Sequence, residues 1–371
     1  MRQVLSFLKT NAVMLIAMMA AIITSIIVPP DEEYLGYFDF RTLTCLFTVL
    51  LVVCALKNVR FFYTVAEKIV KHFKNVRLAS LGLVYITFIG SMLIANDMAL
   101  LTFLPLGYFV LISSKKEKHM CTVFILQNIA ANLGGMLTPF GNPQNLYLYS
   151  RFEIPDLEFM GIMLPPFLLA IAMITLSVFI FLPAEPIEFS GVERKLPMPR
   201  VITYLVLFAF SIVCVFRAVP YEWALLVIPP VILILDKGAF LKVDFGLLLT
   251  FVFFFIFSGN MSRIGGVQEL FSALLEQSTL VVSALSCQLI SNVPSAILLS
   301  QFTENYRELL LGVNIGGCGT LISSLASLIT FREYCEHDPK GTVKYLLRFT
   351  LFNVAYLVIM LVFCLLLVTF T

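Results

Sequence analysis

One acidic residue of this sequence, Asp97, differs from the others in its surroundings. The other acidic residues fall in polar segments, whereas Asp97 follows Ala95-Asn96 in the middle of the apolar stretch 78–112. An ionisable side chain inside a membrane costs on the order of 2.5–3.5 kcal/mol on insertion scales, so such a residue usually has a function. We interpret Asp97 as a ligand for a cation, a proton or a substrate; capping of a helix start by its carboxylate is the alternative.

A second chemical signal lies in segment 138–145, Thr-Pro-Phe-Gly-Asn-Pro-Gln-Asn. Two prolines remove backbone donors and a glycine loosens the chain between them, so the segment cannot form a continuous helix. Carbonyls freed by such a break can coordinate Na⁺, and the start of the next half-helix can attract an anion. A simple proline kink is the alternative. The segment predicts cation ligands at Thr138 and Gly141 and substrate ligands at Asn142 and Asn145.

This segment has a counterpart later in the chain. Residues 132–146 align without gaps with 314–328, and the Asn, both Gly, the Thr and the final Leu coincide. Upstream, Ala95-Asn96-Asp97 corresponds to Ser291-Asn292-Val293. Paired glycines can serve helix packing alone, but two matched segments, each downstream of an Asn, favour an internal repeat. The repeat predicts substrate contacts at Asn96, Asp97, Ser291, Asn292, Ser295 and Ser324, and cation contacts at Asn96, Asp97, Asn292, Thr320 and Ser323.

The elements that must position these residues cross a membrane. Hydrophobic residues make up 60% of the 371 and charged residues only 13%, where a soluble domain has roughly 25% charged residues. Several apolar runs approach the ~20 residues that a span needs, and we interpret the first, 11–29, as a retained helix. The three histidines fall in loops and the eight cysteines show no Cys-x-x-Cys spacing, so neither an enzyme nor a zinc site is indicated. We expect no cofactor and no nucleic-acid partner.

Most lysines and arginines fall in alternate loops. By the positive-inside rule these loops and the N-terminus are cytoplasmic, and the C-terminus lies on the extracytoplasmic side of the inner membrane. Both 57–77 and 113–119 are then cytoplasmic, so the apolar segment between them enters and leaves on one face. Two arms of about 17 residues reach roughly 25 Å, short of a ~30 Å core. A re-entrant hairpin with a polar tip at Asn96 fits this length.

These assignments divide the all-α chain into two halves of opposite topology, a design established for transporters. Two helices precede the hairpin unit in the first half and three precede it in the second. Because the numbers differ by one, the second unit enters the membrane from the opposite side. The first half, 1–185, contains two helices, an interfacial helix 58–77, a hairpin 78–112, a broken helix 120–150 and a helix 159–182. The second half, 198–371, contains three helices, an interfacial helix 263–277, a hairpin 278–303, a broken helix 308–330 and a helix 349–370.

At these residues the sequence resembles the ion transporter superfamily, which includes divalent-anion/sodium symporters, citrate permeases, arsenite permeases and a type of Na⁺/H⁺ antiporter. The resemblance implies two opposed hairpins whose tips meet the substrate, Na⁺ between each tip and the following broken helix, an elevator motion and a homodimer. It also implies a sodium ligand at Ser91, one turn before Asn96. The sequence departs from the Ser-Asn-Thr tips of the family at Ala95, Asp97 and Val293.

We therefore expect a secondary active transporter, coupled to Na⁺ or to H⁺ through Asp97, that carries a small anion such as a di- or tricarboxylate. No Lys or Arg falls in the apolar interior, so helix dipoles and bound cations must neutralise such a substrate. Two alternatives stay open: efflux of arsenite or a related oxyanion, and Na⁺/H⁺ antiport. A channel is disfavoured because nothing resembles a ring-forming filter.

Overall fold

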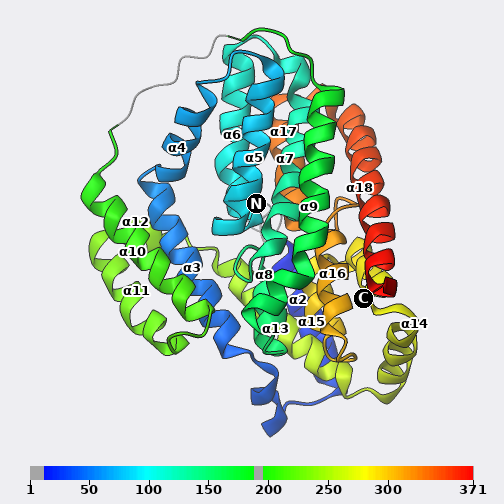
Figure 1. Cartoon of the computed structure of the whole chain (residues 1–371). Coiled ribbons are helices and arrows are strands. Elements are labelled where there is room, and N and C mark those ends of the chain that lie inside the picture. Colours follow the sequence, from blue (N-terminus) through cyan, green and yellow to red (C-terminus); the bar gives the residue numbers. More distant parts are fainter. Residues whose placement is uncertain (1–11, 188–194, 371) are drawn as a thin grey trace.

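The computed structural model describes residues 12–187 and 195–370, which fold into helices joined by short connections (Figure 1). Within these described ranges, nine helices are long and apolar enough to cross a membrane. Large apolar side chains lie on the outside of the bundle; Leu176 in α9 (Asp156–Phe181) is 61% exposed, and Leu347 in α18 (Thr342–Phe370) is 69% exposed. In a membrane, lipid would cover these apolar surfaces. Helices suit that environment because they satisfy their own backbone hydrogen bonds. The expected polytopic helical membrane protein is confirmed.

The helices of the first half follow the apolar runs closely. The interfacial helix expected over 58–77 is shorter than predicted, because α3 extends to Asn58 and Asn75 begins the next helix by accepting a hydrogen bond from Leu78 N. The elements are α2 (Ala12–Ile27), η1 (Glu32–Tyr37), α3 (Phe40–Asn58), α4 (Phe61–Val70), α5 (Val76–Ile94), α6 (Asn96–Ser113), η2 (Glu117–His119), α7 (Met120–Gly134), η3 (Gly135–Leu137), α8 (Pro143–Arg151) and α9 (Asp156–Phe181).

In the second half, one long helix contains a break. Helix α14 has non-helical angles at Ser278 (φ −169°, ψ 102°), at the expected border between segments 263–277 and 278–303. The elements are α10 (Met198–Val215), α11 (Tyr221–Leu235), α12 (Lys237–Leu241), α13 (Phe245–Ser262), α14 (Gly265–Ile290), α15 (Asn292–Leu299), α16 (Tyr306–Ile315), α17 (Leu325–His337), η4 (Pro339–Gly341) and α18 (Thr342–Phe370).

Helices from the two halves of the sequence mix in space. Helix α3 packs against α10, α11 and α12, and this group stands at one side of Figure 1, while α2 packs along α13. On the other side, α7 packs against α5, α6, α9 and α17, and α14 packs against α15 and α16. Helices α5, α6, α7, α9 and α17 therefore form one group, and α3 with α10, α11 and α12 forms another.

Loops that the charge pattern assigns to one face contact each other. Glu185 accepts hydrogen bonds of 2.7 Å from Lys116 Nζ and from Lys118 Nζ. These charged hydrogen bonds, led by that from Lys116, lower the pKa of Glu185 to about 2. Among the loops assigned to the opposite face, Arg263 binds both carboxylate oxygens of Asp31 at 2.6 and 3.0 Å. The contacts agree with the grouping of the loops derived from charge.

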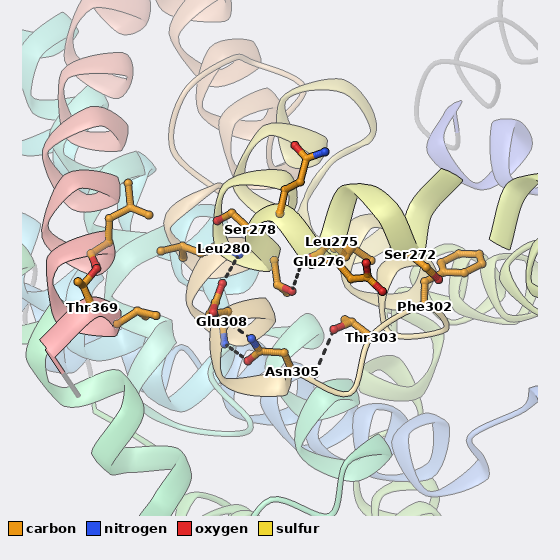
Figure 2. Close-up of a pocket in the computed structure, with 14 residues that line it drawn as sticks. Ser272, Leu275, Glu276, Ser278, Leu280, Phe302, Thr303, Asn305, Glu308 and Thr369 are labelled. Carbon is orange, nitrogen blue, oxygen red and sulfur yellow. Dashed lines mark hydrogen bonds between the residues drawn. The ribbon is translucent and has the colours of Figure 1, made fainter. Parts of the chain in front are cut away.

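The break at Ser278 borders a polar cavity of about 440 Å³, shown in Figure 2. Glu308 Oε2 accepts a 2.9 Å hydrogen bond from Leu280 N, and Glu308 Oε1 accepts one of 2.9 Å from Asn305 Nδ2. The carboxylate thus caps the part of α14 that restarts after the break. None of the predicted site residues lines this cavity.

Candidate functional site

The same tight junction joins the two arms of each predicted hairpin. Ala95 links α5 to α6 with φ 65° and ψ 152°, and Ser291 links α14 to α15 with φ 76° and ψ 159°. Positive φ is uncommon outside glycine, and such strain concentrates at functional sites. In each case the oxygen of the following asparagine accepts a 2.9 Å hydrogen bond from the next backbone N–H: Asp97 N donates to Asn96 Oδ1, and Val293 N donates to Asn292 Oδ1.

Matched glycines bring each broken helix against its hairpin. A Cβ at Gly134 would lie 2.2 Å from Phe88 O and 2.6 Å from Ser91 Oγ. A Cβ at Gly316 would lie 2.8 Å from Cys287 Sγ. Both positions therefore require glycine for the approach of the helices. Ser91 and Cys287 occupy corresponding places, five residues before the asparagine of each tip.

The matched threonines also make corresponding contacts. Thr138 Oγ1 donates a 2.8 Å hydrogen bond to Met92 O, and Thr320 Oγ1 donates one of 3.2 Å to Gln288 O. Each of these carbonyls lies four residues before the tip asparagine. The two threonines differ in burial, since Thr138 is buried and Thr320 is exposed.

Two asparagines that sequence reasoning did not assign to the site connect the halves. Asn132 Oδ1 accepts hydrogen bonds from Asn96 Nδ2 at 3.3 Å and from Ser324 Oγ at 2.8 Å. Asn314 Oδ1 accepts one from Asn142 Nδ2 at 3.3 Å, and Asn314 Nδ2 donates one to Asn145 Oδ1 at 2.6 Å. Each asparagine therefore binds the loop of the opposite half. Their signal in the sequence was their place as the first identical pair of the repeat.

Asn145 stabilises the break in the first half. Its Nδ2 lies 3.1 Å from Gly135 O, 3.2 Å from Met136 O and 3.3 Å from Thr138 O. These contacts supply a donor to carbonyls that the proline-containing loop leaves without helical partners. Asn142 and Asn145, both predicted to bind substrate, are thus fully buried and directed into the protein network.

The predicted cation ligands gather around the broken helices. In the first half, a Cβ at Gly141 would lie 2.7 Å from Thr138 Oγ1, next to the contact of Gly134 with Ser91. In the second half, Ser323 Oγ donates to Gly317 O at 2.9 Å and to Thr320 O at 2.8 Å, and Ser323 O accepts a hydrogen bond from Asn292 N. Carbonyl and hydroxyl oxygens are ligands suited to hard cations. No group of three His, Cys, Asp or Glu residues that could hold a metal occurs in the described residues.

Both hairpin tips face a cavity of about 560 Å³ that helices α2 and α13 close on the other side. Of the predicted substrate ligands, Asn142, Asn145 and Ser295 do not line it; Ser295 is buried and donates to Ser291 O at 2.7 Å. Those that do line it are Asn96, Asp97, Ser291, Asn292 and Ser324. Four further polar residues of the lining were not predicted: Gln144, Asp244, Thr250 and Ser286.

The carboxylates of this cavity set its electrostatics. Asp97 lies in the first turn of α6, its Oδ1 is buried without a hydrogen-bond partner, and the N-cap residue is Ala95. Asp244 accepts a 2.9 Å hydrogen bond from Leu247 N at the start of α13. The lining contains no Lys, Arg or His from the described part of the chain. A ligand with negative charge therefore needs a cation beside it or must bind where helix starts point.

Comparison with known proteins decides the family. A family model described as a citrate transporter matches residues 3–305. The chain belongs to the citrate transporter family. The predicted relationship to the ion transporter superfamily is thereby confirmed, and a transporter rather than an enzyme family accounts for the chain.

Two relatives agree with this membership of the citrate transporter family. The chain is 33% identical over 314 residues to an uncharacterized transporter of Methanocaldococcus jannaschii, covering 82% of this chain and 84% of the relative. It is 28% identical over 309 residues to the inner membrane protein YbiR of Escherichia coli, covering 79% and 80%. The chain is thus a multi-pass membrane transporter.

Proposed function

We propose that this citrate transporter family member is a secondary active transporter that moves a small carboxylate anion, such as citrate or a dicarboxylate, together with Na⁺ or H⁺. The observation that carries the proposal is the cavity that both tips line, with Asn96 from one tip and Asn292 from the other. Amides and hydroxyls can bind carboxylate oxygens, and the start of α8 contributes its dipole. Broken helices that meet at such a cavity are the usual substrate site of transporters with repeats.

The coupling cation is assigned to Asp97 and to the oxygens around the broken helices. Asp97 is the carboxylate of a hairpin tip in this cavity, and its Oδ1 makes no hydrogen bond. A cation or proton bound there removes the repulsion that Asp97 would exert on an anion. At 5 Å and an effective dielectric constant of 20, this repulsion is about 3 kcal/mol per charge pair. Binding of cation and anion is therefore coupled.

Alternating access is proposed as an elevator motion. The hairpins and broken helices would move as one body against the group of α3 and α10–α13, with each half inverted relative to the other. The matched contacts of Thr138 and Thr320 support a repeat, because residues at corresponding positions make the same hydrogen bonds. A homodimer with cytoplasmic N-termini and extracytoplasmic C-termini completes the proposal.

Efflux of arsenite is a second candidate, and the cavity gives a specific reason for it. Two carboxylates and no described cationic side chain line the cavity. Such a lining suits arsenite in its uncharged hydroxide form better than it suits a free dianion. Na⁺/H⁺ antiport, the third candidate, needs only Asp97 and the cation ligands. The three candidates differ in the ion that drives transport and in the substrate that is carried.

Transport by purified protein in proteoliposomes separates them. Uptake of labelled citrate, succinate and arsenite is measured under an imposed Na⁺ gradient, an imposed pH gradient or neither, with protein-free liposomes as control. The proposal predicts citrate or succinate uptake that stops when the driving cation gradient is dissipated. Arsenite transport without carboxylate transport supports the second candidate, and Na⁺-driven proton movement without either cargo supports the third; each result contradicts the proposal.

A further inference from the structure

Helix α4 has an exposed side that combines apolar and basic side chains. Val65, Lys68 and Ile69 are exposed, with Val65 at 40% and Ile69 at 44%. Residues at positions i, i+3 and i+4 share one face of a helix. The opposite side, which contains Ala66 and Val70, is buried, and α4 packs against α3, α5 and α6. The exposed side is therefore available to a partner outside the bundle.

The segment around α4 is strongly basic. Residues 57–77 contain six Lys or Arg and one acidic residue, Glu67, which is only 6% exposed. Arg60 at the start of α4, Lys68 within it and Lys74 after it are exposed. Within this segment the exposed surface therefore has positive charge and no exposed carboxylate.

Both properties suit the surface of a membrane. An amphipathic helix with a basic polar side lies in the interface, and clusters of Lys and Arg there attract anionic headgroups. The charge pattern assigns this segment to the cytoplasmic side, where anionic lipids concentrate. We propose that anionic phospholipid headgroups of the inner leaflet bind the α4 surface, which consists of Arg60, Val65, Lys68, Ile69 and Lys74. The inference goes beyond the proposed function and does not depend on the substrate.

The corresponding segment of the second half is also amphipathic but lacks the cations. The first part of α14, residues 265–277, exposes Leu270 at 58% and Leu274 at 38%. It contains Glu269 and Glu276 and no Lys or Arg. A position at the membrane surface accounts for the apolar side chains of both segments, and attraction to anionic lipid accounts for the cations of one. The positive-inside rule also produces such a difference, but it predicts no lipid preference in the folded protein.

Helix α4 also links the two groups of helices described above. It follows α3 of one group and precedes α5 of the other, and it contacts both of them as well as α6 (Figure 1). A headgroup bound on the exposed side of α4 would therefore anchor this link at the membrane surface.

Fluorescence quenching by brominated lipids tests the inference with the full chain in vesicles. Val65→Trp places a reporter on the α4 surface, and Leu270→Trp places one on the corresponding segment of α14. Each is combined with Trp223→Phe, which removes the one native Trp. Quenching by brominated phosphatidylglycerol is compared with quenching by brominated phosphatidylcholine at equal mole fractions. We expect a preference for phosphatidylglycerol at position 65 and none at position 270.

Removal of the cations tests the cause of this preference. In the position-65 reporter, each of Arg60→Gln, Lys68→Gln and Lys74→Gln should lower the relative binding constant for phosphatidylglycerol by up to about fivefold, and the triple variant should show little preference. Higher salt should weaken the preference of the parent protein. The control removes three exposed cations elsewhere, with Lys237→Gln, Lys340→Gln and Lys344→Gln, and should leave the preference unchanged.

Equal quenching by the two lipids at position 65, or an equal preference at both positions, overturns the inference. A preference that survives the triple change on α4, or that falls equally in the control, also overturns it. Inorganic phosphate at constant ionic strength should leave the quenching unchanged; loss of the preference would assign the surface to a soluble anion instead. Melting temperatures identify folded variants, and Lys68→Gln alone replaces a triple variant that does not fold. Since no measurement reads transport, failure here leaves the proposed function standing.

Discussion

Ser324 Oγ donates a 2.8 Å hydrogen bond to Asn132 Oδ1, which joins the loop of the second half to the broken helix of the first. The corresponding bond from Asn142 to Asn314 runs in the other direction between the halves. All four side chains are buried. These polar contacts therefore join the loops of both halves.

Removal of the Ser324 hydroxyl tests this cross-connection. Ser324→Ala is expected to reduce the free energy of unfolding by about 1–3 kcal/mol, because Asn132 loses a buried donor. Denaturation in detergent measures the change, and Ser113→Ala, at an exposed position, should stay within about 0.5 kcal/mol of the wild type. In a double-mutant cycle with Asn132→Ala, strictly additive effects would contradict a direct interaction.

The close approach at Gly134 predicts a steric effect. Gly134→Ala should destabilise the protein by about 1–3 kcal/mol or more, since the new methyl would lie 2.2 Å from Phe88 O. Gly161→Ala is the matched control in helix α9, where a Cβ meets nothing within 4 Å. There the change should raise stability by up to about 1 kcal/mol. Equal melting temperatures for the two variants would refute the packing.

The cap at the α14 break predicts a local effect. Glu308→Ala removes the acceptor of Leu280 N and should cost about 1–2 kcal/mol, the range measured for lost helix caps. Hydrogen exchange would show faster exchange at Leu280 and in the following turn. Glu304→Ala, which changes an exposed neighbour, should leave that exchange unchanged, and a similar increase in both variants would argue against a specific cap.

The loop cluster at Glu185 predicts a pH dependence. Hydrogen bonds from Lys116 and Lys118 lower the pKa of Glu185 to about 2 in the folded protein, below the ordinary value of about 4.3 for glutamate. A depressed folded pKa stabilises the fold above the unfolded pKa, and the contribution is lost as pH falls from about 4.3 towards 2.

Glu185→Gln should therefore lower the melting temperature slightly and by a constant amount between about pH 5 and 8, and the difference should shrink below about pH 4.3. Melting curves of both proteins across this range measure it. A difference that grows on acidification would contradict the ionised contact.

Local chemistry in the sequence located most of the helix borders and the breaks between them. Proline and glycine composition identified the break at 138–145, and the polar tips identified the junctions at Ala95 and Ser291. The orientation of α8 could not be predicted, because all three amides at 142, 144 and 145 have similar local chemistry. Only tertiary packing directs Asn142 and Asn145 inward and Gln144 to the cavity.

Long-range contacts account for the other residues that sequence reasoning missed. Asp244 reads as a helix cap, and it does cap α13; its place opposite the hairpin tips follows from the packing of α13. Asn132 and Asn314 were visible as a repeated pair, but their exchange of partners between halves depends on how the halves meet. The length of α4 was also mispredicted, because the amphipathic pattern over 58–77 continues beyond the ends of the helix.

The most direct test of the account compares the ion dependence of citrate uptake by the wild type and by Asp97→Asn in proteoliposomes. Asn is close to Asp in shape but cannot take up a proton or carry the negative charge that attracts a cation. We predict wild-type uptake that rises with an inward Na⁺ or proton gradient, and Asp97→Asn uptake that has lost this dependence at normal thermal stability. An Asp97→Asn protein with unchanged Na⁺ and pH dependence would contradict coupling through this residue.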